Sequence, residues 1–139
     1  MTVYEENEKK KEWLSKYKIL LKKQEDLIYK IQEIRASKLF PSYQMDGMPR
    51  ASNSSDLSQF AATVDELMEE LKHTVDRVDS AKRKIESQLK KMNSERHAEV
   101  LKLRYIKMMD WDSIASEMGI SYRHVLRIHG EALEMLEIS

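Results

Sequence analysis

The hydrophobic residues of the first forty positions recur at steps of three and four. The main row consists of Trp13, Tyr17, Leu20, Leu27, Ile31 and Ile34, and it is widened by Leu14, Leu21 and Ile28. This spacing is that of an α-helix with one apolar face, so it predicts a long amphipathic helix from Val3 to Lys38. At about 1.5 Å per residue, such a helix is roughly 50 Å long.

A segment rich in turn-forming residues follows this helix. Residues 39–55 contain both prolines of the chain, one glycine and a cluster of serine and asparagine, which predicts a loop. Its apolar residues suit a cap over the tip of a helical hairpin, and its length also suits a docking segment for a partner. Both interpretations stay open at this point.

A second periodic stretch begins after the loop. One row repeats every seven residues, and a second row joins it: Leu57, Val64, Leu71, Val78, Ile85 and Met92, with Ala61, Met68, Val75 and Leu89. The pattern predicts a second long helix that begins near Asp56, whose side chain can cap it. Two long helices with one connection predict an antiparallel, coiled-coil-like hairpin over residues 1–92.

Residues 93–139 are predicted to form three shorter helices. Asn93 or Ser94 can cap a helix that runs to about Ile106, Asp110 can cap Trp111–Met118, and Ser121 can cap a last helix that runs nearly to the end. Counted from Trp111, the fifth residue is small and the ninth is glycine, as a helix-turn-helix requires. The residues that meet these requirements or fill the shared core are Ile114, Ala115, Met118, Gly119, Ile120, Val125 and Ile128.

The composition favours the same all-α fold. Charged residues make up 35% of the chain, which has only three glycines and two prolines, and a β-sandwich would need more turn residues than that. Cysteine is absent, so neither disulfides nor a thiolate metal site is expected. The charged N-terminus has no signal-peptide core, and no apolar run reaches the ~20 residues of a membrane span, so we expect a cytoplasmic protein with no membrane partner.

Two stretches of the last third, "ERHAEVLKLRYI" and "DWDSIASEMGISYRHVLRIHGEALEML", resemble region 4 of bacterial sigma factors. The whole chain, including "PSYQMDGMPR" and "SDLSQFAA", is similar to phage and prophage proteins of Gram-positive bacteria related to the ArpU and RinA type of late-transcription activators. These resemblances imply a sequence-specific transcriptional regulator in the bacterial host cell. It is expected to read double-stranded promoter or operator DNA in the major groove.

The resemblance also implies which residues contact DNA. Tyr122, Arg123 and Arg127 match positions that face bases, where an arginine can bind guanine bidentately. Lys102 and Arg104 match basic positions near the phosphate backbone. Two residues at the start of the last helix complete the expected set of DNA-binding residues, and these are Ser121 and His124.

The charge balance limits how this motif could bind DNA. Residues 1–92 hold 18 Lys/Arg and 16 Asp/Glu, residues 93–139 hold 6 and 8, and the chain is neutral overall. DNA-binding domains usually carry a basic excess, and here Leu126 and the acidic "ALEMLEIS" replace basic residues of the sigma pattern. We therefore expect a homodimer with two motifs, which the wide apolar rows also favour, or help from host RNA polymerase.

Two other functions remain as alternatives, and enzymatic activity is not expected. The chain could be a small-terminase-like DNA-packaging protein, or an RNA polymerase-binding module without independent DNA binding. His124 and His129 are five residues apart and lie on different helix faces, so no metal is expected. The chain has no phosphate loop, nucleophile elbow or zinc signature, which argues against a cofactor, a small-molecule substrate and catalysis.

Overall fold

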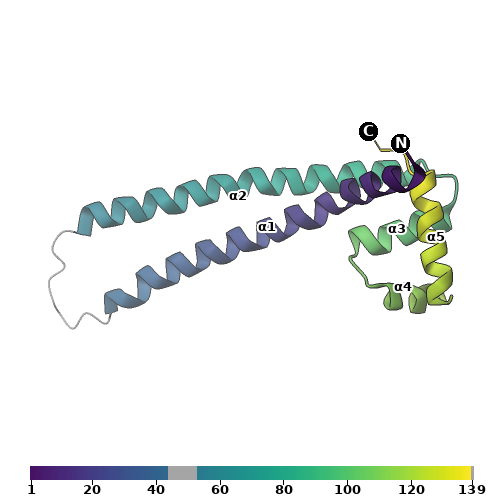
Figure 1. The fold of residues 1–139 in the computed structure, drawn as a ribbon. Coiled ribbons are helices and arrows are strands. Elements are labelled where there is room, and N and C mark those ends of the chain that lie inside the picture. The colour runs from purple at the N-terminus through teal and green to yellow at the C-terminus, as the bar shows by residue number, and fades with distance from the viewer. Residues whose placement is uncertain (44–52, 139) are drawn as a thin grey trace. The chain divides into compact units, whose positions relative to one another are not determined.

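The computed structural model describes residues 1–43 and 53–138, and it is helical in the manner predicted (Figure 1). The elements in chain order are α1 (Val3–Tyr43), α2 (Asn53–Lys90), α3 (Glu95–Leu101), η1 (Lys102–Ile106), α4 (Trp111–Met118) and α5 (Tyr122–Met135). A pair of long helices followed by a helix-turn-helix region confirms the predicted all-α class. Within the described part of the chain, none of the helices has the length and apolar character to cross a membrane.

The two long helices are longer than predicted. α1 ends at Tyr43 instead of Lys38, and Pro41 lies in its last turn. α2 begins at Asn53, so the prediction that Asp56 caps it was wrong. Asp56 lies in the first turn, where a carboxylate still favours the positive end of the helix dipole. Of the predicted loop, residues 44–52 lie outside the described residues, and both interpretations of the loop stay predictions.

The chain forms two compact units whose boundary crosses both long helices. One unit combines residues 1–20 with residues 78–139, and the other contains residues 21–77. The predicted domain boundary between residues 92 and 93 stays a prediction.

In the unit of residues 21–77, the two long helices pair in antiparallel fashion. Leu27 and Ile31 of α1 pack with Leu67 of α2, and Ile34 and Leu71 lie at the margin of this cluster. Nζ of Lys23 lies 3.5 Å from Oε1 of Glu70. The chain therefore runs in opposite directions along α1 and α2.

The second apolar row predicted for α2 is only partly correct. The buried positions that accompany Val64 are Leu67 and Thr74, whereas Met68 and Val75 are 43% and 44% exposed. Thr74 is accommodated in the core because its hydroxyl donates to the carbonyl oxygen of Glu70, 2.9 Å away. From Val64 onward, the residues of α2 that face α1 are thus spaced alternately by three and four positions, and we call this line of residues the buried seam. Met68 and Val75 of the predicted row each come one residue after a seam position.

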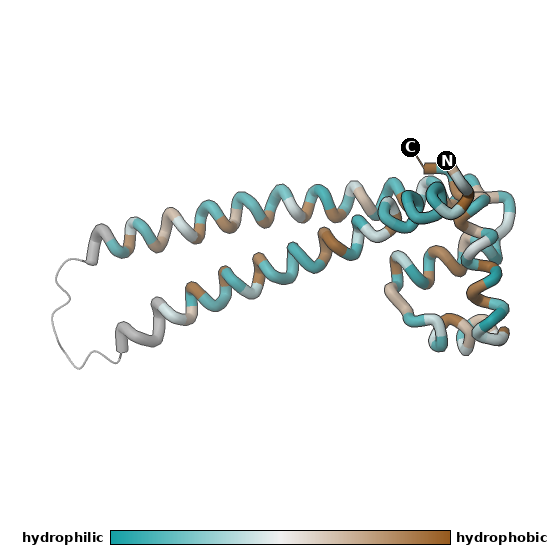
Figure 2. The backbone as a smooth tube through the Cα atoms, viewed as in Figure 1, coloured by the Kyte–Doolittle hydropathy of each residue, from teal (hydrophilic) through white to brown (hydrophobic). Residues whose placement is uncertain are grey.

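The other unit contains the helix-turn-helix. Its core consists of Val100, Leu103, Ile114, Ala115, Val125 and Ile128, with Met109, Trp111, Met118 and Ile120 packed against it. This confirms the predicted inward positions of the motif. In Figure 2, apolar residues occur along α5 as bands separated by polar ones, as expected of a helix with one buried face.

Residues far from the motif complete this unit. Leu14 and Tyr17 of α1 and Ile85 and Leu89 of α2 are buried, each at most 8% exposed. The C-terminal half of α5 is buried as well, at Ala132, Leu133 and Leu136. The helix-turn-helix is therefore part of a larger packed unit that includes the beginning of α1 and the end of α2.

Candidate nucleic-acid interface

Three local signals that the sequence predicted set the two ends of α4 and the start of α5. Oδ1 of Asp110 accepts the backbone N–H of Ser113 at 2.8 Å, which caps α4 and holds the pKa of Asp110 below its usual value. Gly119 ends α4 with φ 69°, a left-handed conformation that glycine adopts without strain. Oγ of Ser121 then accepts the backbone N–H of His124 at 3.1 Å and caps α5. These contacts fix the direction in which α5 leaves the turn.

The first two turns of α5 divide clearly into a buried and an exposed face. Val125 and Ile128 are 0% and 2% exposed, whereas Tyr122 is 49% exposed. Arg123 and Arg127 are also exposed. The structure therefore brings together the three residues that were predicted to face bases, on the side of α5 opposite its core.

Two further side chains change the charge of this face. The pKa of His124 is lowered by desolvation and by the nearby positive charges of Arg127 and Arg96, which disfavours the charged form of its ring. Glu131 lies four residues after Arg127 and adds a negative charge. Its pKa is lowered chiefly by the hydrogen bond with His97 and also by Arg127. The positive charge of the exposed face is thus confined to the first half of α5.

His97 connects the start of α3 to α5. Its Nε2 lies 2.9 Å from Oε1 of Glu131, and its Nδ1 lies 2.7 Å from Oγ of Ser94. Oγ of Ser94 also accepts the backbone N–H of His97 at 3.3 Å, which confirms Ser94 as a cap of α3. No sequence spacing pointed to the pair of His97 and Glu131, because 34 positions separate them.

The helix predicted to run to Ile106 ends there, but its last five residues form a π-helical turn, η1. The backbone N–H of Lys107 donates to the carbonyl oxygen of Lys102, and that of Met109 donates to the carbonyl oxygen of Leu103, both at 3.0 Å. Leu103 and Ile106 are both buried in this wider turn. The prediction of a regular helix was wrong at this point, because tertiary packing rather than local spacing selects such a turn.

Arg104 belongs to η1 and is half-buried, and its side chain reaches the segment between η1 and α4. Its Nη1 donates to the carbonyl oxygen of Met109 at 3.1 Å, and its guanidinium carbon lies 4.2 Å from the centre of the Trp111 ring. A cation over an indole face is an attractive contact. Arg104 therefore holds the turn that leads into α4, and its predicted contact with a phosphate stays a prediction.

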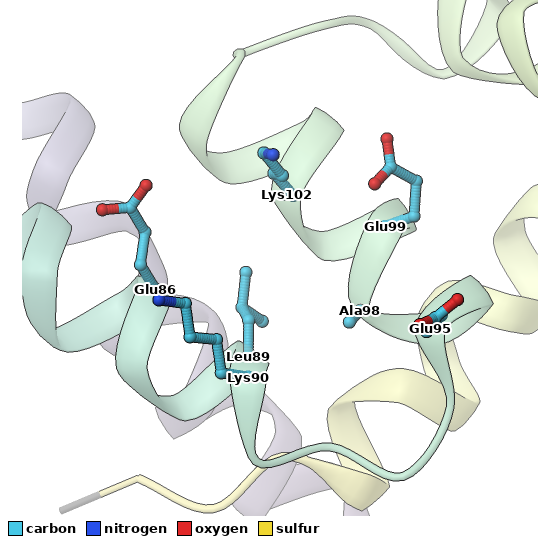
Figure 3. Close-up of a pocket in the computed structure, with 7 residues that line it drawn as sticks. All are labelled: Glu86, Leu89, Lys90, Glu95, Ala98, Glu99 and Lys102. Atoms are coloured by element: carbon cyan, nitrogen blue, oxygen red, sulfur yellow. The ribbon is translucent and has the colours of Figure 1, made fainter.

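Lys102 is exposed. It lines an open cavity of about 330 Å³ between the end of α2 and α3, shown in Figure 3. The other lining residues are Glu86, Leu89, Lys90, Glu95, Ala98 and Glu99. Three carboxylates share this cavity with Lys102, so its surroundings are less positive than its sequence position indicated.

His129 belongs to the core that supports α5. It is 7% exposed, its Nε2 lies 2.8 Å from the Tyr105 hydroxyl, and its ring meets Trp111 edge-on with centroids 4.7 Å apart. Burial, aided by the positive charges of Lys11 and Arg104, lowers the pKa of His129 to about 4. Burial also raises the pKa of Tyr105 to about 12. Both groups are therefore neutral at pH 7. Through their contacts with each other and with Trp111, they connect η1, α4 and α5.

The same segment is recognised by comparison with known families. Residues 94–137 match the family model Sigma-70, region 4. This segment is thus similar to sigma-70 region 4, which indicates a DNA-binding helix-turn-helix and agrees with the capped turn and the exposed face of α5. No curated protein and no solved structure matches the chain.

Proposed function

We propose that the protein is a sequence-specific transcriptional regulator of phage or prophage origin, acting in the cytoplasm of the bacterial host. α5 enters the major groove of promoter or operator DNA in this proposal. The observation that carries it is the exposed cluster of Tyr122, Arg123 and Arg127 on the second helix of a capped helix-turn-helix. The match to sigma-70 region 4 supports the same placement.

Each DNA-binding residue has a distinct role in the proposal. Arg123 and Arg127 bind base edges, and each bidentate contact with guanine favours the correct base by about 1–3 kcal/mol. Ser121 and His124 lie at the start of α5, where free backbone N–H groups favour a phosphate. Their proposed role, like that of Lys102, is to position the backbone of the DNA.

Arg104 contributes to DNA binding in two ways in this proposal. We propose that its other N–H groups bind a phosphate, while its contacts with Met109 and Trp111 hold the turn before α4. An arginine suits this double task because its planar guanidinium presents five donors. Loss of Arg104 is therefore expected to weaken both stability and binding, whereas loss of Lys102 affects binding alone.

One copy of the domain is expected to hold DNA weakly. Residues 94–137 contain six Lys/Arg and eight Asp/Glu, and Glu131 lies one turn beyond Arg127. Few phosphate contacts mean little counterion release, which supplies much of the affinity for DNA. We therefore propose that the protein acts as a homodimer or together with host RNA polymerase, which sigma-70 region 4 domains also contact.

The test is selection of bound genomic DNA fragments by the purified protein, followed by binding titrations on the selected and on scrambled DNA. Arg123→Ala and Arg127→Ala are expected to reduce the preference for the selected DNA about tenfold or more. Lys102→Ala is expected to weaken binding to both DNAs equally. It should also reduce by about 1 the steepness with which the logarithm of the binding constant falls with the logarithm of the salt concentration. Arg83→Ala, which removes an exposed arginine outside the matched segment, is the control and leaves both quantities unchanged. Equal losses on both DNAs from all three variants would contradict these roles.

The acidic balance of residues 94–137 favours one other candidate, an RNA polymerase-binding module without independent DNA binding. Retention of the protein on polymerase, with no binding to any selected fragment at low salt, would support this candidate over the first. Mass photometry addresses small-terminase-like packaging, because that role requires a ring larger than a dimer.

A further inference from the structure

One flank of the paired helices in residues 21–77 exposes apolar side chains. Ile28 on α1 is 38% exposed, and Met68 and Val75 on α2 are 43% and 44% exposed. Ala61 is exposed on α2 and Leu21 is half-buried on α1. Ala61, Met68 and Val75 are spaced by seven residues, as are Leu21 and Ile28, so each set forms a row along its own helix.

The ion pair between Lys23 and Glu70 shows that the two rows lie on the same side of the helix pair. Lys23 and Glu70 each precede a seam residue, and their side chains meet at 3.5 Å on one flank. Ile28 and Met68 instead directly follow the seam residues Leu27 and Leu67. Each heptad repeat has two buried seam positions. The residue just before the first of them and the residue just after the second lie on opposite sides of the seam. The rows on α1 and α2 therefore share the flank opposite the ion pair.

We propose that this apolar flank, defined by Leu21, Ile28, Ala61, Met68 and Val75, binds the same flank of a second copy of the chain. The resulting core contains four helices, two from each copy. A surface with equivalent rows on both of its helices is suited to a twofold interface, in which each copy contributes the same patch. The proposal specifies the homodimer of the proposed function, but it does not depend on DNA binding.

The charges beside the flank are compatible with a second copy. Glu25 lies beside the row on α1, and Asp65 and Lys72 lie beside the row on α2, all exposed. About a twofold axis parallel to the helices, α1 of one copy faces α2 of the other, and each residue keeps its level along the axis. Because Leu27 packs beside Leu67, the level of Glu25 falls between Asp65 and Lys72 of the other copy. Glu25 and Lys72 have long side chains that can meet across this distance as opposite charges, whereas the shorter side chain of Asp65 stays farther from Glu25.

The size of the flank indicates a dimer of modest affinity. The row on α2 is about 20 Å long from Ala61 to Val75, the row on α1 is about 10 Å long from Leu21 to Ile28, and each helix is about 10 Å wide. The projected patch is on the order of 300 Å² per copy, below the ~800 Å² per partner of a standard interface. We therefore expect dissociation in the micromolar range rather than a permanent dimer.

Sedimentation of the full chain tests the interface. The wild-type protein is expected to change from one 16.4 kDa chain to two as its concentration rises through the micromolar range. The double variant Met68→Glu/Val75→Glu should raise the dissociation constant by about 100-fold or more, because four carboxylates would be brought into the interface. Thr63→Glu adds a carboxylate to the same helix on the ion-pair flank and should leave the dimer intact. A monomeric wild-type protein, or equal dissociation of both variants, would overturn the proposal.

Cross-linking gives a second measurement that does not require the glutamate variant to fold. The chain has no cysteine, so Ile28→Cys and Met68→Cys proteins can be prepared separately and mixed under mild oxidation. We expect a disulfide-linked pair from this mixture and none from Ile28→Cys mixed with Thr63→Cys. Absence of the first product, or equal amounts of both, would overturn the proposal.

These measurements are made without DNA, so the two proposals can fail separately. A dimer with the expected cross-link that binds no DNA argues against the proposed function alone. A protein that binds DNA while remaining monomeric argues against the apolar flank alone.

Discussion

Nζ of Lys10 on α1 donates a hydrogen bond to the carbonyl oxygen of Leu133 on α5, 2.7 Å away. It also reaches the carbonyl oxygen of Glu134 at 3.4 Å. The last carbonyl groups of a helix have no partners within it and carry partial negative charge, which a lysine satisfies. The C-terminal end of the helix proposed to read DNA is thus stabilised by a residue 123 positions earlier in the chain.

Removing this contact is expected to destabilise the unit that holds the helix-turn-helix. Lys10→Met keeps most of the aliphatic length and should lower the free energy of unfolding by about 1–2 kcal/mol, the value of a charged hydrogen bond at a helix end. Urea unfolding followed by circular dichroism measures the change. Lys9→Met alters the exposed neighbouring lysine and should have almost no effect. Equal losses from the two variants would show that general charge, and not the contact with Leu133, is responsible.

The hydrogen-bonded pair of Tyr105 and His129, of which His129 is buried, predicts a pH dependence of stability. The pKa of His129 is about 4 in the folded protein, below its ordinary value of 6.5. Between these values the unfolded chain binds the proton and the folded chain does not, so stability falls as the pH drops from 6.5 toward 4. The slope approaches about 1.4 kcal/mol per pH unit within this window.

Urea unfolding at pH 5.0 and pH 7.0 tests this dependence. The lowered pKa values of Glu131 and Asp110 act in the same direction, but they act below the ordinary values of 4.5 and 3.8 and so outside the comparison. The lowered pKa of the more exposed His124 acts within it and adds to the same trend. His129→Phe removes the titrating group and should remove most of the difference in stability between the two pH values. His73→Phe changes an exposed histidine and should preserve that difference. A difference that survives His129→Phe unchanged would refute the assignment.

Two glycines are expected to respond to alanine with opposite signs. Gly119 has φ 69°, so Gly119→Ala forces a side chain into the left-handed region and should cost about 1–2 kcal/mol. Gly130 lies within α5, and a Cβ there meets no atom within 4 Å. Gly130→Ala should therefore stabilise the protein by up to about 1 kcal/mol through helix propensity. Thermal unfolding of the two variants measures both effects, and a shift of both in the same direction would contradict this explanation.

The elements that could be predicted from the sequence depend on neighbours along the chain. Asp110, Gly119 and Ser121 cap or end their helices through contacts that span three or four residues. The inward positions Val125 and Ile128 follow from the helical period alone. Such signals remain readable in a single sequence, because each physical requirement is met within one turn of the backbone.

Other features could not be predicted because they depend on residues that are distant in the chain. The spacing of α2 allowed Met68 as well as Leu67 to join the buried row, and packing against α1 selected Leu67. Arg104 has the residue type and position of a phosphate-binding residue. Its contacts with Met109 and Trp111 become visible only once η1 has placed it over the indole ring.

The sequence by itself determined the helical elements of the last third, their caps and the exposed face with Tyr122, Arg123 and Arg127, because helical periodicity and capping are local. Only the tertiary structure decided that His97 pairs with Glu131, that Lys10 completes the end of α5, and that one flank of the long helices stays apolar and exposed. The physical reason is the same in each case. A contact between distant residues is chosen by the packing of whole helices, and one helix's own pattern allows several such packings.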